Sequence, residues 1–241
     1  MWFWIGVYLV VAVLTQGLIV LVLCKPHLKN YKRKDLLEKY GPFTRRDIDQ
    51  WFKPAALFGL TFWPRFILAT INLAFYCIWV MLVMIGVDLN NPKIGPTRLF
   101  LLRTMGKFSC RLQLLFAGVV WIEYEKMEGA DYRKWLGPDW KPQWEGAGTL
   151  IFNHHSWMDI LAALSTFYPS FVSKKSVKKY PFIGTIATAI DSVFLDRAGT
   201  KEEKKAAAIQ IEERQKQNEV TKRPPILIFP EGATTNNEYL I

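Results

Sequence analysis

Uncharged apolar residues are concentrated in the first half of the chain. The first run covers residues 2–24 without a charged side chain, and a helix of that length crosses a hydrocarbon core of about 30 Å. The run lacks the basic start and the small-residue cleavage site of a secretory signal peptide. It therefore predicts an uncleaved transmembrane anchor over residues 1–24. The basic block behind it predicts a cytoplasmic loop over residues 25–65.

A second uncharged run, residues 66–87, is also long enough to cross a membrane. A crossing would place its two flanks on opposite sides, yet residues 93–111 are basic like the loop before the run. Basic flanks favour the same side of a membrane. We therefore favour a bent or re-entrant helix pair that enters and leaves one leaflet over a true second span.

Cations recur every four residues within the next apolar segment, residues 99–122. Arg103, Lys107 and Arg111 fall on one stripe if the segment is helical. A basic stripe on an apolar helix is typical of a helix at the membrane interface, but a core helix with one wet face gives the same pattern. Residues 66–122 are thus predicted as membrane-embedded and interfacial helices.

From residue 123 onward, short apolar runs alternate with helical patterns and turn residues. Strands are predicted at residues 121–127, 149–152, 169–172, 192–195 and 225–229. Helices are predicted at residues 157–167, 181–190 and 201–220. This alternation predicts an α/β domain over residues 123–241, with a mostly parallel sheet covered by helices.

Charge and composition fit a membrane-associated protein. The 241 residues carry 31 Lys and Arg against 21 Asp and Glu, a formal charge of +10, and 15% are aromatic. Basic and aromatic side chains gather at lipid headgroups, and two long apolar runs make a membrane a better partner for this charge than a nucleic acid. The three cysteines form no C-x-x-C pair, which excludes a disulfide framework and a zinc site.

The first candidate site follows the strand at residues 149–152. His154 and Asp159 are five residues apart, so His154 fits the strand-to-helix turn and Asp159 the first helical turn. The carboxylate could then orient the imidazole and stabilise its protonated form, and the nucleophile would be a substrate hydroxyl. Two alternatives stay open: Ser156 and Asp159 also form a capping-box pattern, and His155 could be the base instead.

Two further segments end predicted strands. Arg197 follows the strand at residues 192–195, where its planar donor group could bind a phosphate or simply pair with Asp196. The segment at residues 229–236 runs from an apolar strand into Pro-Glu-Gly and then hydroxyl side chains. Its glycine permits a tight turn whose free backbone N–H groups could bind an anion. The segment could equally be an ordinary turn without a ligand.

In this order, the three segments resemble the motif set of the glycerolipid (lysophospholipid) acyltransferases. Asn153, His154 and Asp159 match the family's Asn-His-x4-Asp motif, Phe194 and Arg197 match Phe-x-x-Arg, and residues 229–232 match Phe-Pro-Glu-Gly. The resemblance covers about residues 120–241. The amino-acid sequence after Asp159 is similar to that of the family branch that acylates lysophosphatidylcholine and lysophosphatidylethanolamine.

The resemblance implies an acyl transfer from acyl-CoA to a lysophospholipid hydroxyl, without a metal or a bound cofactor. His154 would be the general base and Asp159 would orient it. The lysophospholipid phosphate would be held by Arg197, Glu231 and Gly232. Candidates for the phosphates of CoA, which could equally be a solvated lysine run, are Lys174, Lys175 and Lys178.

The sequence also departs from the family pattern. Ala233 stands where a threonine is usual, Asp191 and Ser192 stand where a glycine is common, and the chain stops soon after the third motif. The alternative function is therefore a non-catalytic, acyltransferase-like subunit of a membrane assembly. The expected location is the endoplasmic reticulum or another organelle membrane, with the mitochondrial inner membrane as the alternative.

Overall fold

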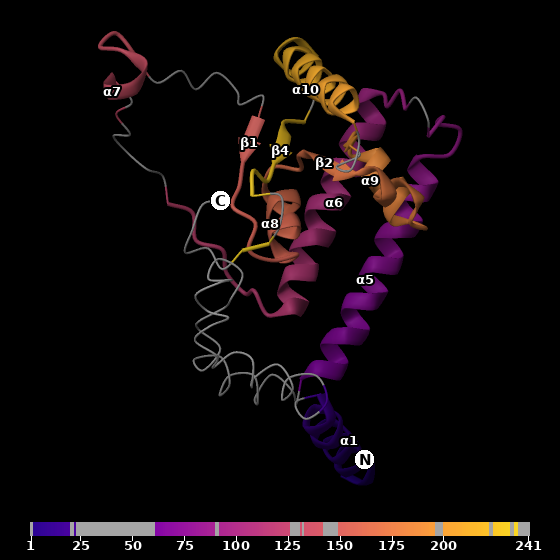
Figure 1. Ribbon diagram of the computed structural model, residues 1–241. Coiled ribbons are helices and arrows are strands. Elements are labelled where there is room, and N and C mark those ends of the chain that lie inside the picture. The colour runs from indigo at the N-terminus through magenta and orange to yellow at the C-terminus, as the bar shows by residue number, and fades with distance from the viewer. Residues whose placement is uncertain are drawn as a thin grey trace.

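The computed structural model describes residues 2–19, 22, 61–89, 92–125, 131, 133–141, 149–195, 200–221, 224–231 and 234–235 (Figure 1). Nearly all of the basic loop predicted at residues 25–65 lies outside these ranges. The helices before the sheet are α1 (Trp2–Ile19), α5 (Phe62–Val83), α6 (Pro96–Ala117) and α7 (Arg133–Leu136). The later helices are α8 (Met158–Thr166), the 3₁₀ helix η3 (Lys175–Lys179), α9 (Ile183–Ala189) and α10 (Lys201–Thr221).

The sheet is parallel, as the alternation of strands and helices predicted. Its strands are β1 (Thr149–Ile151), β2 (Ser170–Lys174), β3 (Val193–Leu195) and β4 (Ile226–Ile228), in the order β1-β4-β2-β3. Ile151 pairs with Ile228, and Val172 pairs with Val193. Each predicted strand from residue 149 onward is confirmed, with its ends shifted by at most two residues.

The strand predicted at residues 121–127 is wrong over the part that the structure describes. Residues 119–125 adopt no strand, and Trp121 is 81% exposed. The Arg111 guanidinium donates to the carbonyls of Val119 and Val120, at 3.1 and 2.6 Å. These two carbonyls lie just before the predicted range, and a side chain of α6 satisfies them without a strand partner.

Helices cover both faces of the sheet. On one face, Gln215 of α10 donates to the Thr149 hydroxyl of β1. On the other face, Leu150 and Phe152 pack against the core that contains α8. Because successive strand residues point to opposite faces, these two contacts place α10 and α8 on different sides of β1.

α5 and α6 form an antiparallel hairpin. The Asn72 amide donates to Ser109 and Gln113, at 3.0 and 2.9 Å, whereas Trp79, further along α5, donates to the earlier residue Leu101. α5 is continuous and begins four residues before the apolar run at 66–87, because a proline in the first helical turn loses no hydrogen bond that the helix needs. The helix pair is therefore made by α5 with α6, and no bend falls within α5.

The hairpin and the sheet share one core. Tyr76 and Val80 of α5 and Leu102 of α6 are buried with Tyr168, which follows α8. Gly106 of α6 is the point of closest approach, since a Cβ there would overlap the Tyr168 ring. One face of α6 is therefore a core face. Its outer surface combines the exposed side chain of Arg103 with three exposed apolar side chains, Phe100, Phe108 and Leu115.

Among the described residues, α5 is the one helix long and apolar enough to cross a membrane, with a mean hydropathy of 2.2. The first apolar segment appears as a shorter apolar helix over Trp2–Leu18. The anchor at residues 1–24 and the domain boundaries stay predictions.

Candidate active site

The sheet brings the first and third motifs together. β1 and β4 are parallel neighbours in register, and the Phe152 N–H donates to the Ile228 carbonyl at 3.1 Å. The carboxyl ends of both strands therefore meet at one edge. The segments that leave this edge carry His154 and Glu231.

His154 and Asp159 are in contact, as their spacing predicted. The Asp159 Oδ2 atom lies 3.2 Å from His154 Nδ1, and both side chains are about four-fifths buried, with 19% and 22% of their surface exposed. A carboxylate beside Nδ1 favours the tautomer that carries its proton there. The lone pair of Nε2 is then available to accept a proton from a substrate.

Asp159 also shapes the turn in which His154 lies. The same Oδ2 atom accepts hydrogen bonds from the backbone N–H groups of His155 and Ser156, at 2.6 and 2.7 Å. Half of the capping box is thus present, but the Ser156 hydroxyl accepts from the Met158 N–H at 3.2 Å instead of the Asp159 N–H. The capping and dyad interpretations hold together, because one carboxylate oxygen serves the helix start and the imidazole.

The two histidines have different contacts with Asp159. His154 meets the carboxylate through its ring, whereas His155 meets it through its backbone. Of the two candidate bases, the geometry favours His154.

The third motif packs against His154. The Phe229 ring stacks on the imidazole, with centroids 4.1 Å apart and an angle of 25° between the planes. The Thr235 N–H donates to the His154 carbonyl at 2.7 Å, and the Thr235 hydroxyl donates to Glu231 Oε2 at 2.6 Å. The other carboxylate oxygen of Glu231, Oε1, is buried and accepts no hydrogen bond from the described part of the chain.

The predicted lysines follow the neighbouring strand. Lys174 ends β2, and Lys175 and Lys178 lie in η3, all three with exposed side chains. Lys178 Nζ lies 6.0 Å from the centroid of the Phe194 ring. Because β2 pairs with β4, these lysines start from the same edge as the dyad. Arg197 and Gly232 lie outside the described residues.

Comparison with known proteins identifies this region. Residues 133–241 match the sequence model of a family described as acyltransferase. The match covers a little less than half of the chain, so this region is similar to the acyltransferase family. No solved structure matches the chain.

The chain is also similar to curated proteins with lipid acyltransferase names. It is 38% identical over 98 residues to the lysophospholipid acyltransferase LPEAT1 of Arabidopsis thaliana, covering 40% of this chain and 25% of that protein. It is 35% identical over 89 residues to a lyso-ornithine lipid O-acyltransferase of Rhodobacter capsulatus, covering 37% of this chain and 30% of that protein. The match thus spans less than a third of the length of either relative.

Sequence reasoning assigned no role to two residues of the candidate site. Phe229 was noted only as a motif letter, and Thr235 only as part of a hydroxyl-rich run. The signal for Thr235 was its place just after a Pro-Glu-Gly turn, but its two partners are known only from the fold.

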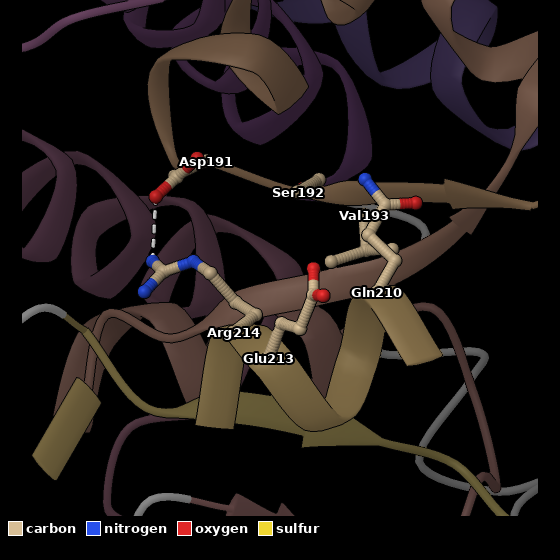
Figure 2. A pocket seen from close by; sticks show the side chains of 6 residues that line it. All are labelled: Asp191, Ser192, Val193, Gln210, Glu213 and Arg214. Atoms are coloured by element: carbon tan, nitrogen blue, oxygen red, sulfur yellow. Dashed lines mark ion pairs between the residues drawn. The ribbon is translucent and has the colours of Figure 1, made fainter. Parts of the chain in front are cut away.

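A polar cavity of about 200 Å³ lies at the opposite edge of the acyltransferase sheet (Figure 2). It lies between α10 and the amino end of β3, and its lining includes Arg214, Asp191 and Glu213. Arg214 is buried and pairs with Asp191 at 2.5 Å, shown by the dashed line in Figure 2. This ion pair fastens α10 to the start of β3, on the far side from His154.

Proposed function

We propose that this protein transfers an acyl chain from acyl-CoA to the hydroxyl group of a lysophospholipid. The observation that carries the proposal is the contact between His154 and Asp159 at a sheet edge shared with Glu231. The printed names of the relatives, lysophospholipid and lyso-ornithine lipid acyltransferases, support a lipid acceptor.

The dyad accounts for each proton in the reaction. His154 Nε2 accepts the proton of the lipid hydroxyl as its oxygen attacks the thioester carbonyl. Asp159 stabilises the imidazolium that forms. The tetrahedral intermediate then collapses, the carbon–sulfur bond breaks, and the thiolate of CoA takes the proton from His154. The new bond is an ester, and the dyad returns to its starting state.

The remaining predicted residues fall into two groups, one suited to CoA and one suited to the acceptor lipid. Lys174, Lys175 and Lys178 are exposed cations at the edge that carries the dyad, and they suit the phosphates of CoA. Arg197 suits the phosphate of the acceptor lipid. The carboxylate of Glu231 would repel that phosphate, so it suits a hydrogen-bond donor of the lipid instead.

The hairpin is proposed to attach the domain to one leaflet. The loop end of the hairpin is covered by protein, since Val80 and Met84 are buried with Ile190 after α9. The other end of α5 projects beyond α8 and the sheet (Figure 1). Its residues 62–72 measure about 16 Å as a helix, roughly half of a 30 Å hydrocarbon core.

The experiment is an acyl-transfer assay with labelled acyl-CoA, lysophospholipid and the full-length protein in detergent or vesicles. Wild type should form labelled phospholipid, and His154→Ala should lose at least about a thousandfold of that activity, since the base and the orientation of the hydroxyl are both lost. His155→Ala is the matched control and should keep most activity, because its contact to Asp159 uses the backbone. Equal activity of wild type and His154→Ala would overturn the mechanism.

The alternative, a non-catalytic membrane subunit, is not favoured. The relatives named above carry acyltransferase names, and the dyad has the geometry that the reaction needs. A full-length protein that folds and binds both substrates without transferring label would favour the non-catalytic subunit instead.

A further inference from the structure

Thr235 connects the two halves of the candidate site. Its backbone N–H donates to the carbonyl of His154, at 2.7 Å, and its hydroxyl donates to Oε2 of Glu231, at 2.6 Å. The residue is only 6% exposed, although its neighbour Thr234 is exposed. One buried residue is thus bonded to the first motif through its backbone and to the third through its side chain.

The hydrogen bonds of Thr235 lie past the last backbone pairing between β1 and β4. The hydrogen bond from Phe152 to Ile228 is followed by two segments that leave the sheet edge without further strand pairing. Thr235 closes this interval, because its N–H reaches the carbonyl of His154. Without this bond, the backbone of His154 would depend on the contacts of its own turn.

One bond acts on the backbone of His154, and the other acts on the side chain of Glu231. The imidazole of His154 is held by Asp159 at one edge and by the Phe229 ring on one face. The Thr235 hydroxyl fixes one oxygen of Glu231 and so sets the direction of the other. Acid–base groups need their geometry held within a fraction of an ångström, and rigid hydrogen bonds to neighbouring residues provide this.

We propose that Thr235 is a positioning residue that sets the place of Glu231 relative to His154, and that it thereby governs binding of the acyl-accepting lipid. This inference rests on the proposed function. Thr235 contacts no reacting atom, so it acts through Glu231 and through the His154 backbone. The hydroxyl therefore matters for the lipid acceptor and not for the acyl donor.

The kinetic test compares Thr235→Val, Thr235→Ser and the control Thr234→Val in the full-length protein. Valine keeps the shape and the N–H but removes the hydroxyl, so kcat/KM for the lysophospholipid should fall about 10- to 100-fold while KM for acyl-CoA stays unchanged. Thr235→Ser should restore the activity, and Thr234→Val should match wild type. A loss shared equally by both substrates, or no loss in Thr235→Val, would overturn the proposal.

A double-mutant cycle with Glu231→Ala tests the route of the effect. If the hydroxyl acts through Glu231, Thr235→Val should cost little more once that carboxylate is gone. Fully additive losses would show that the hydroxyl acts elsewhere and would contradict the proposal.

A spectroscopic readout separates this inference from the proposed function. The chain has three histidines, so ¹³C-histidine labelling gives three ring signals, and His154→Ala assigns one. That signal should shift in Thr235→Val but not in Thr235→Ser or Thr234→Val, because a Glu231 carboxylate released from the hydroxyl changes the electric field at the imidazole. This expectation holds whether or not acyl transfer is observed. An unchanged His154 signal in Thr235→Val would sink the positioning role, whereas a shifted signal in a protein without transfer activity would sink only the proposed reaction.

Discussion

At the scale of single residues, one carboxylate oxygen performs two tasks. Asp159 Oδ2 accepts hydrogen bonds from two backbone N–H groups and also lies within hydrogen-bonding distance of His154 Nδ1. The backbone donors hold the oxygen in place, so the imidazole meets an acceptor whose position is already fixed. A residue that caps a helix is in this way also suited to orient a base.

A buried thiol gives a second prediction at this scale. Cys110 is 4% exposed, and burial raises the pKa of its thiol to about 12. The thiol should therefore stay protonated and resist alkylation at pH 8.5 in the folded protein, whereas the unfolded thiol, with an ordinary pKa of about 8.5, should react readily.

Mass spectrometry of a variant that carries Cys24→Ala and Cys77→Ala would measure this. Alkylation of Cys110 should become fast only after denaturant is added. Equal rates with and without denaturant would mean that the packing of α6 against the core is wrong.

At the scale of elements, α6 contacts both α5 and α8 and so connects the hairpin to the sheet domain. Its middle contacts α5 through Asn72, and it contacts the end of α8 through Lys107, whose ammonium group donates to the Thr166 carbonyl at 2.5 Å. Burial, with the nearby Arg103, lowers the pKa of Lys107. A cation at the carboxyl end of α8 is favourable because the last carbonyls of a helix carry partial negative charge.

The close approach of α6 to Tyr168 leads to a prediction. Gly106→Ala would add a Cβ that overlaps the Tyr168 ring and lies 2.8 Å from the Tyr76 hydroxyl oxygen. We expect the free energy of unfolding to fall by about 1–3 kcal/mol, because overpacking outweighs the better helix propensity of alanine.

Chemical denaturation followed by far-ultraviolet circular dichroism would measure this loss. Gly17→Ala in α1 is the matched control, since nothing lies within 4 Å of its added Cβ, and it should be neutral or slightly stabilising. A Gly106→Ala protein as stable as wild type would mean that α6 and Tyr168 lie further apart.

At the scale of the whole molecule, the hairpin shares one core with the sheet and also exposes apolar surface. Tyr76 and Tyr168 approach each other through their hydroxyl groups, at 3.3 Å, so this contact joins α5 to the segment after α8. The outer side of α5 leaves Phe66, Ile71 and Phe75 exposed. A hairpin fixed to the sheet in this way would hold the dyad at a constant height above a membrane.

One-leaflet attachment predicts the same sidedness for both flanks of the hairpin. In a cysteine-free protein reconstituted into vesicles, Arg45→Cys and Lys93→Cys should react with a membrane-impermeant maleimide from the same side. The control Phe3→Cys should react from the opposite side if the first helix spans. Labelling of the two flanks from opposite sides would exclude the one-leaflet arrangement and favour a crossing by α5.

The sequence by itself determined the features that depend on residues close together in the chain. Apolar runs and turn residues identified β1 to β4 and the helices between them, because these patterns depend on neighbours a few residues away. The five-residue spacing of His154 and Asp159 was enough to predict their contact, since both belong to one strand-to-helix turn. The exception is residues 121–125, where the apolar pattern predicted a strand but Trp121 and Tyr124 stay exposed and no strand forms.

Only the tertiary structure decided which distant segments meet. The strand order β1-β4-β2-β3 places Glu231 beside His154, although 76 residues of chain separate them. It also gave Thr235 its two partners and made α6 a core helix on one face. These outcomes depend on packing and hydrogen bonds between elements, and such long-range contacts leave no periodic signal in the sequence.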